Sequence, residues 1–195
     1  MITALYAVIT FFILKIYSRH ELTNEEIKMA FTQSLELGKK VEQLAEKYFK
    51  SHNYNYVDVR NNPAFREIDV DYIVDGIGFF EVKANFTTAL KGKEGKFFWI
   101  ELSIDDNQGW WKFTKATHFL FFDEKGNGVL IRNDINFINF INDAIENGDH
   151  DIYGNHRFDY KKDERYNKFV TAKNMRVYLS DIPSTINITR IIRRY

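Results

Sequence analysis

The stretch from Arg66 to Lys83 constrains the fold of this chain more than any other. It reads REIDVDYIVDGIGFFEVK, with apolar and polar residues alternating on both sides of a short glycine-containing segment. Alternation with a period of two is typical of β-strands, and Asp-Gly is typical of a tight turn between them. The pattern predicts two strands, residues 68–74 and 79–84, joined as an antiparallel hairpin.

The length of the turn decides which side chains share a face of this hairpin. Glu81 and Lys83 are two apart on one strand, so both side chains project from the same face. A two-residue loop would place Asp69 and Asp71 on the opposite face. A three-residue loop, residues 75–77, brings these acids and the Glu81–Lys83 pair to one side. We therefore expect an odd loop or a bulge if the four residues act together.

Acidic side chains that converge on a sheet repel each other unless a cation lies between them. Carboxylate oxygens suit Mg²⁺ or Mn²⁺ better than zinc. Such an ion keeps positions open for phosphate oxygens and water, and it acidifies the bound water. Lys83 would lie beside that water or the scissile phosphate as a positive charge. The simpler interpretation of Glu81 and Lys83 is an ion pair on a sheet surface.

The composition excludes several classes of site. The chain has 195 residues, enough for one domain, and 45% of them are apolar, which is ample for a packed core. Because there is no cysteine, disulfides, thiolate zinc sites and cysteine nucleophiles are excluded. The formal net charge is zero, so binding to nucleic acid would depend on a local basic patch.

Helical and strand-like segments surround the hairpin. Helices are expected from Asn24 to about residue 50, which Gly38 could divide in two, from about residue 105, and from Asp134. Asn61-Asn-Pro63 is expected to be a turn, and residues 149–170 are polar and irregular. Further strands are expected over residues 54–60, 97–104, 117–123, 129–131 and 175–179. This order predicts an α/β fold with a central mixed sheet flanked by helices.

An apolar segment, residues 1–20, precedes the expected domain. Residues 2–17 include a run that is short for a membrane span, which needs about 20 residues. As a membrane anchor, this segment would leave the rest of the chain in the cytoplasm, tethered to the inner face of the membrane, because Lys15 and Arg19 follow the run. The alternative is a helix or strand that packs on the domain or on a partner.

The hairpin motifs resemble those of a known enzyme family. Asp69 within Glu-Ile-Asp, followed by Glu81-Val82-Lys83, resembles the core of the PD-(D/E)XK nuclease superfamily. Glu42, in an upstream helical stretch, matches the helix glutamate of small bacterial nuclease-like families and Holliday-junction resolvases of that superfamily. The resemblance implies a restriction-endonuclease-like core. Its motifs lie within residues 34–122 of a single domain, residues 21–195.

The resemblance also implies roles for individual residues. Asp69 and Glu81 would bind Mg²⁺, with Mn²⁺ as a substitute, and the Val82 carbonyl would be a further ligand. Lys83 would position or polarise the attacking water. Glu42 would assist with the metal, and Gln108 would orient the site. Asp71 is the alternative to Asp69, and a solvated helix face is the alternative explanation of Glu42.

DNA is the expected partner, and a homodimer is left open. Lys91, Lys93 and Lys96 could follow the phosphates, although loop solubility explains them equally well. Trp110 could stack on a base, but a tryptophan at this spacing more often belongs to a core. The sequence therefore predicts a Mg²⁺-dependent deoxyribonuclease. The alternative is a non-catalytic nucleic-acid-binding or interaction module on the same fold.

Overall fold

The computed structural model describes residues 24–84, 86–87, 96–104, 107–123, 125–147, 152–159 and 169–191. Its helices are α2 (Asn24–Ser51), α3 (Pro63–Glu67), α4 (Trp110–Phe113) and α5 (Ile135–Asn147). Its strands are β1 (Tyr56–Asp58), β2 (Tyr72–Val74), β3 (Gly78–Lys83), β4 (Phe86–Thr87), β5 (Phe97–Ile104), β6 (Asn107–Gln108), β7 (His118–Phe122), β8 (Gly128–Arg132), β9 (Ile152–Asp159), β10 (Phe169–Tyr178) and β11 (Ile188–Ile191).

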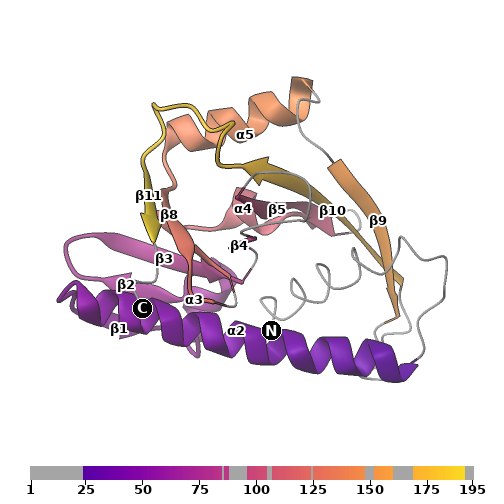
Figure 1. The fold of residues 1–195 in the computed structure, drawn as a ribbon, viewed down its shortest axis with the longest axis horizontal. Helices are drawn as coiled ribbons and strands as arrows, with labels where there is room; N and C mark the ends of the chain where they lie inside the picture. The colour runs from indigo at the N-terminus through magenta and orange to yellow at the C-terminus, as the bar shows by residue number, and fades with distance from the viewer. Residues whose placement is uncertain are drawn as a thin grey trace.

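The strands form two sheets (Figure 1). The first has the order β1-β2-β3-β7-β8-β11, and only its β3–β7 pair is parallel. The second is antiparallel, with the order β4-β5-β10-β9 and β6 paired to β5. The predicted α/β fold with a mixed sheet is confirmed. A second sheet was not predicted.

The two faces of the first sheet pack against different layers. On one face, Val41 and Phe49 of α2 pack with Val82 and Leu120. Full burial of one such apolar side chain stabilises the fold by about 1.5–3 kcal/mol. The other face packs against α5, α4 and the inner residues of the second sheet, such as Phe98. In Figure 1, α2 (indigo) runs below the strands and α5 (orange) lies above them.

The hairpin has the three-residue loop that the motif requires. Val74 pairs with Gly78, and the Ile77 N–H donates to the Val74 carbonyl oxygen at 3.1 Å. Gly78 has a φ of 141°, and a Cβ there would lie 2.2 Å from the Thr117 hydroxyl. This position therefore needs glycine. The predicted odd loop is confirmed.

The first strand of the hairpin is shorter than predicted. The Asn62 side chain accepts a hydrogen bond from the Ala64 N–H at 3.1 Å and caps a short helix that Pro63 begins. The expected turn at residues 61–63 therefore starts α3. Asp69 follows this helix with a φ of 52°, so it lies outside β2.

Other local predictions were also wrong. α2 continues through Gly38 without a break, because one glycine costs a long helix only about 1 kcal/mol. Asn107 and Gln108 form β6, and α4 begins after Gly109, whose N–H donates to the Leu102 carbonyl oxygen at 2.8 Å. The expected irregular stretch, residues 149–170, contains β9 and the start of β10. Here the pairing of β9 with β10 overrides a polar sequence.

The N-terminal segment, residues 2–17, lies outside the described residues. In the part of the chain that the structure describes, no helix is both long enough and apolar enough to cross a membrane.

Candidate functional site

The structure brings Asp69, Glu81 and Lys83 together, and we call these three residues the lysine cluster. The Lys83 Nζ donates to Asp69 Oδ2 at 3.3 Å and also contacts Glu81 Oε1. Lys83 is 1% exposed, Glu81 2% and Asp69 8%. The three charges are therefore nearly removed from water, and each depends on the others for its stabilisation.

Strand β3 directs the side chains of Glu81 and Lys83 toward the space between the two sheets. β3 is paired in parallel with β7, with Glu81 beside Phe119 and Lys83 beside Phe121. These residues alternate with Phe80 and Val82, which pack toward α2. The Lys83 Nζ lies 4.7 Å from the ring centroid of Trp110, a cation–π distance. Trp110 is fully buried, so its ring is not a surface platform for a base.

Asp71 is a third acid close to the lysine cluster. Its Oδ2 accepts a hydrogen bond from the Val82 N–H at 2.9 Å, and its own N–H donates to the Phe80 carbonyl oxygen at 2.8 Å. Burial raises the pKa of Asp71 to about 6, and the negative charge of Asp69 adds to the increase, whereas Lys83 opposes it. Asp71 therefore shares the electrostatic environment of the cluster although it is bonded to the backbone of β3.

Burial and mutual contact shift the other titrating groups. Burial raises the pKa of Glu81 well above its usual range, and Asp71 raises it further. Burial alone would lower the pKa of Lys83, but the carboxylates of Asp69, Glu81 and Asp71 together raise it. Lys83 is therefore protonated at neutral pH.

Two carboxylates of the lysine cluster could hold a divalent cation. Glu81 Oε2 is buried without a hydrogen-bond partner, and such a carboxylate oxygen can coordinate a metal ion. Among the described residues, no three His, Asp or Glu side chains are grouped as a metal site. Mg²⁺ is commonly held by one or two carboxylates together with water and phosphate oxygens. Asp69 and Glu81 could supply those carboxylates.

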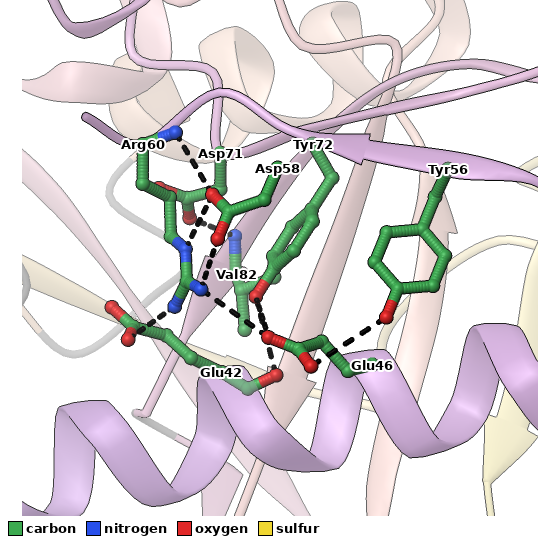
Figure 2. Close-up of polar contacts among 8 residues, drawn as sticks. All are labelled: Glu42, Glu46, Tyr56, Asp58, Arg60, Asp71, Tyr72 and Val82. Atoms are coloured by element: carbon green, nitrogen blue, oxygen red, sulfur yellow. Dashed lines mark hydrogen bonds and ion pairs between the residues drawn. The ribbon is translucent and has the colours of Figure 1, made fainter. Parts of the chain in front are cut away.

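Glu42 belongs to a second group of charges. Figure 2 shows Arg60 among the carboxylates of Glu42, Glu46 and Asp58, and we call these four residues the arginine cluster. Arg60 Nε donates to Asp58 Oδ1 at 2.9 Å and Nη2 to Glu46 Oε1 at 3.3 Å, while Nη1 contacts Glu42. The Tyr72 hydroxyl donates to the Glu42 carbonyl oxygen at 3.3 Å.

The two clusters lie on opposite sides of the first sheet. α2, which carries Glu42, covers the face opposite to that of Lys83. The carboxylate of Glu42 contacts Arg60 and not Lys83, and its predicted role in metal binding stays a prediction. Burial raises the pKa of Glu42, and Arg60 opposes this increase. The sequence analysis missed Arg60 as the partner of Glu42, and the spacing of Asp58 and Arg60, two residues apart at the end of β1, is a signal that could have indicated this charged group.

The remaining predicted site residues are dispersed. Gln108 is exposed in β6, where it pairs with Ser103, so it does not lie on a helix as predicted. Val82 is fully buried in β3, between Glu81 and Lys83. Lys96 lies just before β5 and is partly exposed. Lys91 and Lys93 lie outside the described residues.

Comparisons with protein-family models, with curated proteins and with solved structures found no match for this chain.

Proposed function

We propose that this protein is a Mg²⁺-dependent nuclease that hydrolyses DNA phosphodiester bonds on a restriction-endonuclease-like core. The observation that carries the proposal is the convergence of Asp69, which lies just before β2, and Glu81 of β3 on Lys83. This is the set of groups that a metal-assisted attack of water on a phosphate diester requires.

The charge balance supports a divalent ion at this site. If the carboxyl groups of Asp69, Asp71 and Glu81 are all ionised, these groups and the Lys83 ammonium carry a net charge of about −2 in a buried environment. Burial is the main cause of the raised pKa values of Asp71 and Glu81, and the neighbouring carboxylates add to the increase. A divalent cation would neutralise the site and keep both groups ionised.

Each residue then has a role. Asp69 and Glu81 would hold Mg²⁺, which supplies a Lewis acid for the phosphate and lowers the pKa of a bound water. Lys83 stays protonated, so it would donate hydrogen bonds to the attacking water or to a phosphate oxygen instead of removing a proton. Asp69 is the most exposed of the three, so the phosphate would approach from its side.

A cleavage assay tests this proposal. The full chain would be incubated with plasmid, linear and branched DNA, with Mg²⁺ or Mn²⁺ and with a chelator. We expect metal-dependent cleavage that falls at least about a hundredfold in Lys83→Met and Glu81→Gln. Glu46→Gln, which changes a carboxylate of the arginine cluster, is the matched control and should retain activity. A folded wild-type chain that binds metal but cleaves no more DNA than these variants contradicts the proposal.

The burial of the lysine cluster favours a second candidate. Lys83 and Glu81 are 1% and 2% exposed, so the cluster could serve only to stabilise a nucleic-acid-binding or interaction module of the same fold. A chain that binds DNA with unchanged affinity in Lys83→Met, and cleaves none of the substrates, would favour this candidate.

A further inference from the structure

Asp69 adopts a backbone conformation that needs external support. Its φ of 52° lies in the left-handed region, which residues with a Cβ visit rarely and aspartate more readily than most. The residue lies between α3 and β2, so the regular ladder of the sheet does not hold it. Its carboxylate nevertheless reaches the Lys83 Nζ. Other contacts must therefore fix the direction of this side chain.

The segment between α4 and β7 supplies those contacts. The Thr114 hydroxyl donates to the carbonyl oxygen of Asp69 at 2.9 Å and accepts a hydrogen bond from the Ala116 N–H at 3.0 Å. The Lys115 N–H donates to the Ile68 carbonyl oxygen at 2.9 Å. Thr114 is 8% exposed, so water competes little for these bonds. The carbonyl oxygen of Asp69 is therefore held by a buried side chain, that of Thr114.

The same segment also supports the other half of the lysine cluster. The Thr114 N–H donates to the Trp110 carbonyl oxygen at 3.0 Å, and the Trp110 ring faces the Lys83 Nζ. One short turn therefore contacts the ammonium group through Trp110 and the aspartate backbone through Thr114.

We infer that Thr114 is a positioning residue, which holds Asp69 in its left-handed conformation and so aims the carboxylate at Lys83 and at the proposed metal. This inference rests on the proposed function of the lysine cluster. The hydroxyl touches neither the metal nor the DNA, and it acts only through the backbone of Asp69. Ligands of a reactive site must be held to within about 0.5 Å, and a buried side-chain bond to the ligand's own backbone provides such a restraint.

Three substitutions separate this role from general stability. Thr114→Val keeps the shape of the side chain and removes the hydroxyl, whereas Thr114→Ser keeps the hydroxyl. Thr117→Val is the control for loss of a hydroxyl group bonded to backbone, because the exposed Thr117 hydroxyl accepts from the Phe79 N–H at 2.9 Å and donates to the Phe79 carbonyl oxygen at 3.1 Å. Each Val variant therefore loses hydroxyl bonds to backbone, but only Thr114 is bonded to Asp69.

Two measurements are made on each folded variant. The first is the NMR signal of the Lys83 ammonium group in protein labelled with ¹⁵N-lysine, which reports the Asp69 contact without any reaction. The second is the cleavage rate. We expect Thr114→Val to shift or broaden the Lys83 signal and to lower kcat about tenfold to a hundredfold with KM for DNA nearly unchanged. Thr114→Ser and Thr117→Val should resemble the wild type in both measurements.

The outcomes distinguish this inference from the proposed function. A Lys83 signal that Thr114→Val leaves in place, or that Thr117→Val moves equally, overturns the positioning role whatever the cleavage rates are. If the signal moves only in Thr114→Val and the wild type cleaves no DNA, the positioning role stands and the nuclease proposal fails. If Thr114→Val does not fold, a folded Thr114→Ser variant with a displaced Lys83 signal still overturns the inference.

Discussion

The lysine cluster and the arginine cluster both place one cation among carboxylates, but they do so in different surroundings. The side chains of Lys83 and Glu81 are 1% and 3% exposed. Those of Arg60 and Glu42 are 20% and 24% exposed. Water can replace a lost partner in the arginine cluster, whereas in the lysine cluster a lost partner leaves a buried charge uncompensated. Lys83 has two carboxylate partners and Arg60 has three, but each charge of the lysine cluster depends more strongly on its neighbours.

The largest expected difference between the two clusters is the loss of stability when the positively charged side chain, Lys83 or Arg60, is removed. Lys83→Met should lower the free energy of unfolding by about 3–5 kcal/mol, because the carboxylates of Asp69 and Glu81 remain buried. Arg60→Met should cost no more than about 1 kcal/mol, because Glu42, Glu46 and Asp58 can turn toward water. Urea unfolding at neutral pH measures both. Equal losses in the two variants would remove the distinction between the clusters.

Magnesium should stabilise the protein through one cluster only. At concentrations well above the dissociation constant, Mg²⁺ should raise the free energy of unfolding of the wild type by about 1–3 kcal/mol. Glu81→Gln should abolish this increase, since it removes a proposed ligand, while Glu46→Gln should preserve it. Thermal unfolding with and without Mg²⁺ provides the measurement. Stabilisation that survives Glu81→Gln would place the ion elsewhere.

The pH dependence of stability should also differ. Asp71 has a pKa of about 6 in the folded chain, raised from 3.8, so the folded state binds this proton more tightly than the unfolded state. Its contribution to stability is therefore present at low pH and is lost as the pH rises through about 6. Without metal, we expect Asp71 to add about 1 kcal/mol to the free energy of unfolding between pH 7 and pH 5.

The control for this pH effect is Asp71→Asn, which should lack that contribution. The difference between the two proteins reports Asp71 together with its effect on the pKa of Glu81, and it removes the contribution of groups such as His118, whose lowered pKa acts in the opposite direction. Urea unfolding across this range of pH tests the expectation. Parallel curves for the wild type and Asp71→Asn would show that Asp71 titrates normally.

The smallest expected effect is that of salt. At about 1 M ionic strength, screening should reduce the stability cost of Arg60→Met by a few tenths of a kcal/mol. The cost of Lys83→Met should change less, because its partners are buried. Urea unfolding at low and high sodium chloride compares them. A larger salt effect on Lys83→Met would mean that solvent reaches the lysine cluster.

The hairpin and its charged face were predictable because they depend on local rules. The alternation of β3, the glycines of the loop and the position of Glu81 relative to Lys83 are all set within a few residues. The same is true of the apolar spacing in α2 that includes Val41 and Phe49. Such features need no knowledge of distant contacts.

Features that depend on distant contacts were not predicted. Asp69 reaches Lys83 through a left-handed residue that Thr114 holds from 45 residues away, and no period in the sequence encodes that bond. Glu42 lies at the expected place on its helix, but the sheet separates it from Lys83, and Arg60 is its partner. β9 forms although its residues are polar, because it pairs with β10. In each case tertiary pairing decides a position that local preference leaves open.

The lysine cluster depends on the number of residues in the hairpin loop between Val74 and Gly78. One residue added or removed between Val74 and Gly78 would exchange the two faces of β3, which would carry Phe80 toward Trp110 and Lys83 toward α2. Two added residues would restore the original faces and only lengthen the turn. Natural or engineered changes in this loop are therefore expected in steps of two, and a library of loop lengths scored for folding should show that alternation.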